Sequence, residues 1–396
     1  MKVLVEKRFL DRKKTATVLT LILSGIILTA LTITITFNPS ITETENDFYL
    51  GIEVAYGDID DLKAIVSEVK QYTNVLVLGL PEFSINRTLL DESCNFIYDS
   101  NLSFIVLFTN LSQYSDWQNY TPAQWVQDAK EKYGDKFLAV YRWDEPGGDQ
   151  LDKSKYQPVK AADNHAEATK RYIDVLRPEI QYYQKAGQQV LTADYGLYWF
   201  DYMAGYDTVL AEFGWNNSRA QQIALARGAA QAFDKDWGVM ITWTYSNYSS
   251  SPYIESPAEL FNDLLLAYDN GAKYAIVFNY PEIDNAKYGI LTQEHLNTLE
   301  QFWKYSLTHE RLNSSYKNLK TAYVLPTFYG FGFRSASDTI WGLWSHDNLT
   351  TDIYNDVENL ICDQGTNFDI IFDNSKTVSR YDYIIFWNGT TIQRKT

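Results

Sequence analysis

Cysteine and histidine are scarce in this chain of 396 residues, which has two cysteines and four histidines. Cys94 and Cys362 lie far apart, on segments with helical patterns, so we expect no disulfide framework. The histidines show no metal-ligand spacing, and the sequence has no HExxH, CxxC, P-loop or GxSxG motif. These absences disfavour the usual zinc hydrolases, P-loop nucleotide hydrolases and serine hydrolases. We expect neither a metal nor a cofactor.

Positive charge is also in short supply. Lysine and arginine total 34 against 50 aspartates and glutamates, so the formal net charge is -16. A chain with this balance has no folded basic surface to neutralise phosphates, which argues against nucleic acid as a partner. The hydrophobic content of 45% is enough for a sizeable core, and the length indicates one large domain or two.

One long stretch has no charge at all, residues 17–37, "TVLTLILSGIILTALTITITF". As a helix it would span about 30 Å, the thickness of a bilayer core. Six lysines and arginines lie in the preceding segment 1–16, whereas the first charged residues after the stretch, Glu43, Glu45 and Asp47, are all acidic. This asymmetry predicts a single-pass signal anchor in the cell membrane, a cytoplasmic tail at 1–16, a linker at 38–47 and an extracellular remainder. A cleaved signal peptide and a buried soluble helix are the alternatives.

Nine N-x-S/T sequons agree with an extracellular location and predict a glycoprotein. They lie at Asn86, Asn101, Asn110, Asn119, Asn216, Asn247, Asn313, Asn348 and Asn388.

Eight short, continuously apolar segments alternate with helical patterns across residues 48–310. Such runs are typical of strands buried on both faces. The alternation predicts the α/β class and a (β/α)₈ TIM barrel, with an open doubly wound sheet as the alternative. The expected strands are 48–56, 74–80, 103–109, 137–143, 189–194, 208–213, 238–245 and 274–280.

The pattern changes after residue 310. Apolar runs near 321–326, 368–373 and 381–389, with a helical pattern at 350–364, predict a smaller and incomplete α/β unit over 320–396.

Carboxyl groups and aromatic rings gather at the predicted carboxyl ends of the barrel strands, where TIM barrels place their chemistry. Flat aromatic faces stack on sugar rings, and two carboxyl groups, one neutral and one ionised, cleave glycosidic bonds. The pattern therefore predicts a glycan ligand. The candidate site residues at these ends are Glu53, Trp143, Asp144, Glu145, Asp194, Glu212, Trp215, Trp243, Tyr245 and Glu282. Glu82 also follows a predicted strand, the second.

The segment "YRWDEPGG" after the fourth strand resembles the Asn-Glu-Pro signature of retaining (β/α)₈ glycoside hydrolases. A barrel followed by a flavodoxin-like unit also resembles the layout of certain β-galactosidases. The resemblance implies that Glu145 is the general acid/base. Asp144 stands where the family has Asn, and the seventh strand, "VMITWTYSNY", has no acid where the family has its nucleophile.

The second carboxylate must therefore come from elsewhere. Glu212, at the end of the sixth strand, is our leading candidate, followed by Glu282 and Asp194. The preferred hypothesis is a membrane-anchored extracellular glycoside hydrolase. A non-catalytic glycan-binding or cell-envelope protein on the same scaffold is the main alternative, and a different barrel hydrolase or polysaccharide lyase is the third.

Overall fold

A computed structural model describes residues 47–214, 217–242, 244–245, 253–278, 292–311 and 319–394. The predicted anchor at 17–37 and three of the predicted site residues, Trp215, Trp243 and Glu282, lie outside these ranges. So does the side chain of Tyr245. Within the described ranges, no helix has the length and apolarity needed to cross a membrane.

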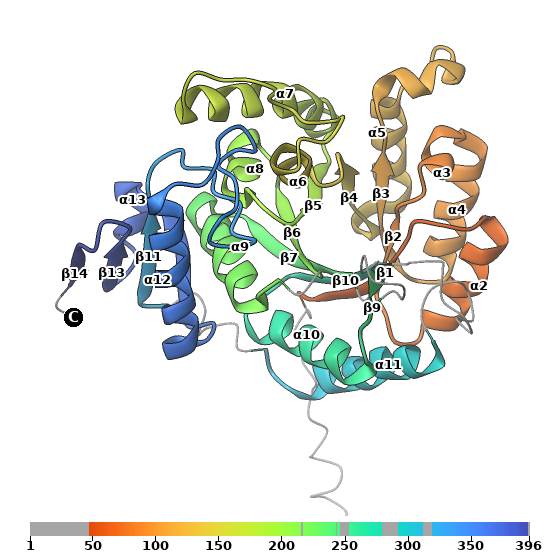
Figure 1. Cartoon of the computed structure of the whole chain (residues 1–396). Coiled ribbons are helices and arrows are strands. Elements are labelled where there is room, and N and C mark those ends of the chain that lie inside the picture. Colours follow the sequence, from red (N-terminus) through yellow and green to blue (C-terminus); the bar gives the residue numbers. More distant parts are fainter. Residues whose placement is uncertain are drawn as a thin grey trace, which may run out of the picture. The chain divides into compact units, whose positions relative to one another are not determined.

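A closed barrel of eight parallel strands forms the centre of the described structure (Figure 1). Its strands run in the ring order β1-β10-β7-β6-β5-β4-β3-β2, so the predicted closure is confirmed and the open sheet is excluded. Seven of the predicted apolar runs contain one of these strands, and the eighth, 238–245, overlaps β7, which begins two residues earlier. Their bounds are β1 (Tyr49–Val54), β2 (Val75–Leu78), β3 (Ser103–Phe108), β4 (Phe137–Arg142), β5 (Gln189–Asp194), β6 (Thr208–Phe213), β7 (Asp236–Ile241) and β10 (Tyr274–Phe278).

Helices surround the strands, and their ends follow local sequence signals. Thr121 forms a reciprocal capping box with Gln124 at the start of α5, and a proline occupies the first helical position. Ser256 and Glu259 form the same motif at the start of α10, again followed by a proline. A short hairpin, β8 (Thr244–Tyr245) and β9 (Tyr253–Ile254), precedes α10. The helices are α2 (Ile59–Val69), α3 (Pro81–Ile85), α4 (Arg87–Asp99), α5 (Pro122–Tyr133), α6 (Pro146–Leu151), α7 (His165–Lys185), α8 (Tyr198–Ala204), α9 (Arg219–Phe233), α10 (Pro257–Asp269) and α11 (Gln293–Thr308), with 3₁₀ turns at Leu111–Trp117 and Gly134–Lys136.

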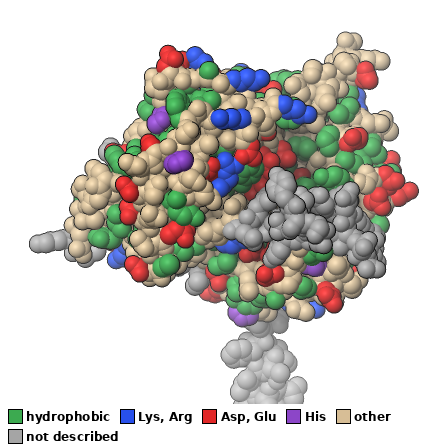
Figure 2. All heavy atoms as spheres, viewed as in Figure 1, with side chains coloured by type: hydrophobic (Ala, Val, Ile, Leu, Met, Phe, Trp, Pro, Cys, Tyr) green, Lys and Arg blue, Asp and Glu red, His purple; other side chains and the backbone are tan. Residues whose placement is uncertain are grey.

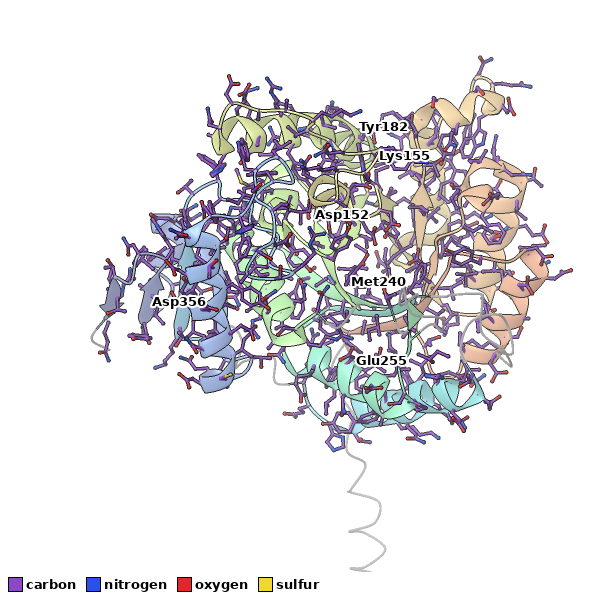
Figure 3. The ribbon with its side chains drawn as sticks, viewed as in Figure 1. Asp152, Lys155, Tyr182, Met240, Glu255 and Asp356 are labelled. Carbon is purple, nitrogen blue, oxygen red and sulfur yellow. The ribbon has the colours of Figure 1, made fainter. Side chains whose placement is uncertain are left out.

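The apolar core has two layers, because side chains alternate between the two faces of each strand. A small cluster fills the barrel interior and includes Tyr141 of β4, Leu191 and Ala193 of β5, Leu210 of β6 and Met240 of β7. Met240 is labelled on its strand in Figure 3. A much larger cluster lies between strands and helices. This alternation decides which strand-end carboxyl groups reach the barrel interior.

The C-terminal unit is a small mixed sheet with strand order β12-β11-β13-β14. The predicted runs correspond to β11 (Thr321–Leu325), β12 (Phe368–Phe372) and β13 (Tyr383–Phe386), which are parallel. A fourth strand that we did not predict, β14 (Thr391–Gln393), pairs with β13 antiparallel. The helices of this unit are α12 (Asn348–Gln364) and the short α13 (Ser375–Val378). The barrel and this sheet belong to one compact unit that begins at Phe48.

A buried ion pair joins the C-terminal sheet to the barrel. Arg227 of α9 donates from Nε to Asp369 of β12 at 2.8 Å, and both side chains are almost fully buried. Asp369 also accepts hydrogen bonds from Gln231 and Tyr381. Because every neighbour supplies a complementary donor or acceptor, the charges can be buried at this contact. The two cysteines are free, as expected, with Cys94 buried and Cys362 exposed.

We expect Asp369→Ala to lower the free energy of unfolding by about 3–5 kcal/mol, because it leaves the Arg227 guanidinium buried without a counter-charge. Chemical denaturation would measure the change. Glu300→Ala, which removes the exposed partner of Lys304 on α11, is the control and should cost less than about 1 kcal/mol. Equal effects of the two substitutions would show that the buried pair does not hold the sheet.

Candidate active site

The chain turns sharply after β4, at the segment that the sequence singles out. Trp143 and Glu145 both adopt left-handed backbone conformations, with φ of 58° and 52°. Such conformations cost non-glycine residues about 1–3 kcal/mol each and occur preferentially at functional sites. Pro146 then begins the short helix α6. The turn therefore places Glu145 off the line of the strand, at the carboxyl end of the barrel.

Two glycines allow this turn to pack against the end of β5. A Cβ atom on Gly147 would lie 2.4 Å from the carbonyl oxygen of Gly196, and one on Gly148 would lie 2.2 Å from the Tyr195 ring. Both distances are too short for a real side chain. The Gly-Gly pair in the motif is thus required by close packing beneath Glu145.

Asp194 lies under this turn and does not face the rim. Its side chain is fully buried and accepts backbone hydrogen bonds from Gly147 at 2.5 Å and Gly148 at 2.9 Å. It also accepts from the amides of Tyr195 and Gly196, at 2.8 and 3.2 Å. We predicted a substrate-binding role for Asp194. The structure instead places it behind the turn, because Leu191 and Ala193 occupy the interior positions of β5.

A second buried carboxyl group, which sequence reasoning missed, lies beside Asp194. Asp201 of α8 is within hydrogen-bonding reach of Asp194 and accepts a hydrogen bond from the Tyr172 hydroxyl at 2.7 Å. Burial raises the pKa of both carboxyl groups, that of Asp194 well above its usual value and that of Asp201 to about 8. The Asp194 carboxyl, with four backbone donors, is the better site for negative charge, so the proton of the pair belongs on Asp201.

Three further carboxyl groups converge on the barrel interior around Tyr141. Glu53 of β1 and Glu212 of β6 occupy interior positions, in the same alternation as Val77 and Leu210. The Tyr141 hydroxyl donates to Asp144, which is exposed at the barrel mouth. Figure 2 shows acidic side chains gathered in a hollow on the viewed face. The predicted residues Glu53, Asp144 and Glu212 are thus brought together.

The interior position of Glu53 depends on a glycine at the end of the neighbouring strand. A Cβ atom on Gly79 would lie 2.0 Å from Glu53 Oε1, so the carboxyl group occupies that space. Burial raises the pKa of Glu53 well above its usual value, and repulsion from Asp144 and Glu145 adds to the shift.

Glu145 and Glu212 lie within hydrogen-bonding reach of each other. Burial and repulsion from Asp144 raise the pKa of Glu145 to about 8. Burial also raises the pKa of Glu212 well above its usual value, and repulsion from Glu145 adds to it. Glu212 is only 4% exposed and its Oε2 atom has no hydrogen-bond partner. Two close carboxyl groups in such surroundings retain a proton at neutral pH.

The aromatic residues predicted at the rim are only partly described. Trp143 is half-buried and packs against the outer core, and its carbonyl oxygen accepts a hydrogen bond from the Thr192 hydroxyl at 2.5 Å. Its neighbour Arg142 faces the helices and forms an ion pair with Glu179 of α7. Trp143 therefore has a structural role in the turn as well as its predicted place beside the acids.

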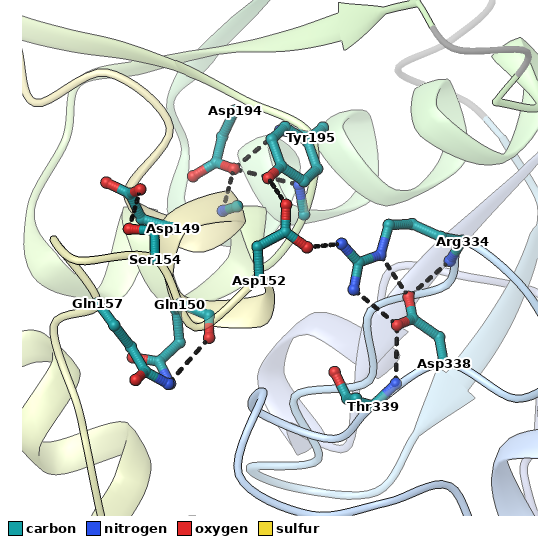
Figure 4. Close-up of polar contacts among 12 residues, drawn as sticks. Asp149, Gln150, Asp152, Ser154, Gln157, Asp194, Tyr195, Arg334, Asp338 and Thr339 are labelled. Atoms are coloured by element: carbon teal, nitrogen blue, oxygen red, sulfur yellow. Dashed lines mark hydrogen bonds and ion pairs between the residues drawn. The ribbon is translucent and has the colours of Figure 1, made fainter. Parts of the chain in front are cut away.

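The C-terminal unit reaches this region through a polar chain that the sequence did not reveal (Figure 4). The Tyr195 hydroxyl donates to Asp152 at 2.7 Å, and Asp152 pairs with Arg334. Arg334 is itself held by Asp338, with two hydrogen bonds of 2.8 and 2.9 Å. Asp152 directly follows α6, which connects this chain to the Glu145 turn.

No group of three or more His, Cys, Asp or Glu side chains has metal-binding geometry within the described ranges. The arrangement offers proton transfer and charge stabilisation between carboxyl groups.

Comparison with known proteins identifies the fold. No family model and no curated protein sequence matches the chain. Solved structures do. The β-galactosidase of Rahnella sp. R3 is similar with a TM-score of 0.61 and 12% identity, over 87% of this chain and 67% of that one. The β-galactosidase of Marinomonas ef1 gives 0.57 and 9%, over 86% and 72%. GH5_18 from Streptomyces cattleya gives 0.54 and 11%, over 86% and 99%. The chain therefore shares the (β/α)₈ barrel fold of these three glycoside hydrolases, and no family is assigned to it.

The carboxyl cluster predicts a stability that falls with rising pH. Glu212 is easier to ionise in the unfolded chain, where a glutamate titrates near 4.3, than in the fold, so stability is lost as pH rises through the folded pKa. Glu212→Gln cannot ionise. We expect its melting temperature to exceed that of the unmodified protein by about 2 °C or more near pH 8 and to match it near pH 4. Parallel pH profiles of the two proteins would contradict a desolvated Glu212.

Proposed function

We propose that this protein is a membrane-anchored extracellular glycoside hydrolase that cleaves a glycosidic bond with Glu145 and Glu212. The observation that carries the proposal is the contact between these two carboxyl groups, with raised pKa values, at the catalytic end of a barrel of glycoside-hydrolase fold. Glycoside hydrolysis requires one carboxyl group that keeps its proton at neutral pH and one that carries negative charge.

Glu145 is the proton donor in this proposal. A pKa of about 8 keeps it protonated at neutral pH, and its half-buried position at the turn gives it access to a leaving-group oxygen. Glu212 is the charged partner. Its ionised form is disfavoured in the empty site, but positive charge that develops on the sugar in the transition state would favour it. Asp144, oriented by Tyr141, is placed to bind a sugar hydroxyl.

A sugar has to separate the two carboxyl groups before they can act on it. Retaining enzymes hold their carboxyl groups about 5–5.5 Å apart and inverting enzymes about 6.5–9.5 Å apart. Two carboxyl groups within hydrogen-bonding reach of each other leave no room for a sugar ring between them. Glu212 is enclosed by the barrel, whereas Glu145 is half-exposed, so the Glu145 side chain is the one that moves aside.

A non-catalytic glycan-binding protein is the second candidate. It is favoured by Asp144 in place of the family's Asn and by the lack of an acid after the seventh strand. In that case the carboxyl groups would only accept hydrogen bonds from sugar hydroxyls. Membrane anchorage rests on the uncharged segment 17–37 and its basic flank.

We expect Glu145→Gln to lower activity by about 10²–10⁴-fold on glycosides with poor leaving groups, because these need a proton. Dinitrophenyl glycosides, which need little protonation, should lose much less. Glu212→Gln should abolish both reactions. Steady-state kinetics on phenyl and dinitrophenyl glycosides would measure this, with galactosides tried first because neighbouring structures are β-galactosidases.

Glu131→Gln, on the exposed outer face of α5, is the matched control and should retain full activity. Hydrolysis of phenyl glycosides by Glu145→Gln at the normal rate would refute the assignment. If the unmodified protein binds oligosaccharides in a thermal-shift assay but cleaves none, the non-catalytic glycan-binding hypothesis is correct.

The full chain should fractionate with membranes, and protease added to intact cells should remove the barrel. The reason is that an uncharged segment of this length, once inserted with its basic flank inside, leaves the larger part of the chain outside. Recovery of a soluble mature chain that begins near residue 38 would indicate a cleaved signal peptide instead.

A further inference from the structure

We propose that Asp194 is a positioning residue that fixes the direction of Glu145, and that it acts with Asp201 as a buried pair holding a single proton. The inference rests on the proposed function in one respect, the role of Glu145 as proton donor. Neither aspartate can touch a substrate, because both side chains are fully buried.

Asp194 accepts four backbone hydrogen bonds, two from the turn after β4 and two from the loop after β5. Oδ2 accepts from the amide of Gly147, and Oδ1 accepts from the amides of Gly148, Tyr195 and Gly196. The first two belong to the residues that directly follow Glu145-Pro146. The last two belong to the loop after β5. One carboxylate thus joins the two strand ends whose relative position determines where Glu145 lies.

The backbone around Glu145 needs such a restraint. Glu145 has a left-handed conformation, and its amide donates to the carbonyl of Ala193 on β5 at 3.0 Å. That single neutral bond is worth about 0.5–1.5 kcal/mol, comparable with the strain it opposes. Hydrogen bonds to a charged carboxylate are worth about 1.5–3 kcal/mol each. The Asp194 contacts are therefore the interactions that keep Glu145 in this conformation.

Asp201 explains how a carboxylate with negative charge is tolerated at this depth. Tyr172 donates to Asp201 Oδ1, and Asp201 Oδ2 has no hydrogen-bond partner. Because Asp194 already accepts four backbone hydrogen bonds, we place the proton of the pair on Asp201 Oδ2, directed towards Asp194. A protonated Asp201 adds a fifth donor to Asp194 and brings no second charge. Asparagine at position 201 would keep this arrangement, since its amide group also offers one acceptor and one donor.

An amide at position 194 would not be equivalent. The carboxylate accepts on both oxygens, and an asparagine side chain would turn an NH₂ group towards at least one backbone N–H. Asp194→Asn therefore removes acceptors from the turn with almost no change in volume. This makes it the sharpest test of positioning.

The experiment compares Asp194→Asn, Asp201→Asn and the control Asp207→Asn. Asp207 also accepts a backbone hydrogen bond, from Val190 at 3.0 Å, but at the opposite end of β5 and β6. Steady-state kinetics on phenyl and dinitrophenyl glycosides gives kcat and KM. Hydrogen exchange, read by mass spectrometry on the peptide containing residues 145–151, gives the order of the turn without requiring activity.

We expect Asp194→Asn to lower kcat about 10²-fold on phenyl glycosides, with KM nearly unchanged and a much smaller loss on dinitrophenyl glycosides. Amide exchange in 145–151 should quicken by about 10-fold or more. Asp201→Asn should lower kcat by less than about threefold. Asp207→Asn should leave kcat, KM and the exchange of this peptide unchanged. If Asp194→Asn does not fold, Gly147→Ala disturbs the same contact, since its Cβ would lie 2.8 Å from Asp194 Oδ2.

An equal loss on both classes of glycoside would overturn the positioning role, because it would indicate general damage to the site. Unchanged exchange in 145–151 would overturn it directly. A loss for Asp201→Asn as large as for Asp194→Asn would refute the shared proton. If the unmodified protein cleaves no glycoside, the proposed function fails, whereas the exchange data alone still decide whether Asp194 holds the turn.

Discussion

Removing carboxyl groups from water is the constraint to which the rest of this structure is fitted. An ionised carboxylate in a protein interior is strongly disfavoured unless it is paired or accepts several hydrogen bonds. The fold meets this cost differently on the two sides of the β4 turn. Behind the turn, Asp194 accepts four backbone hydrogen bonds and lies beside Asp201. Inside the barrel, Glu212 is buried beside Glu145 and keeps an oxygen without a partner. Each cluster thus contains one carboxyl oxygen without a hydrogen-bond partner, Asp201 Oδ2 behind the turn and Glu212 Oε2 inside the barrel.

The barrel was predictable because its signals are local and repeated. Every barrel strand overlaps a predominantly apolar run, and helices such as α5 and α10 begin at capping residues that can be read from the sequence. Strand β14 was missed for the opposite reason. Its residues, Thr391–Gln393, are exposed and largely polar, so its pairing with β13 leaves no apolar pattern.

The site was predictable only in part. Glu53, Asp144, Glu145 and Glu212 were found because they end strands of a barrel, and the structure brings them together. Asp194 ends a strand too, but it lies on the outer face. Side chains alternate between the two faces of a strand, so Asp194 points away from the interior face that Leu191 and Ala193 share. Asp201 contacts Tyr172 and Arg334 contacts Asp152, and both pairs are far apart in the sequence. No local sequence pattern predicts such contacts.

The C-terminal unit and the carboxyl cluster are joined by charge as well as by packing. Arg227 fixes the sheet to α9, and Arg334 reaches Asp152 at the end of α6, the helix that begins immediately after Glu145. Tyr195 contacts both α6 and the residue that follows it, because its ring packs on Gly148 and its hydroxyl donates to Asp152. The turn is thus held by Asp194 on one side. On the other side it is held by the contacts from Tyr195 through Asp152 to Arg334 of the C-terminal unit. With its backbone held on two sides, Glu145 has only its side-chain torsions free. In the proposed reaction, rotation about these torsions is the motion by which Glu145 would leave Glu212 and make room for a sugar.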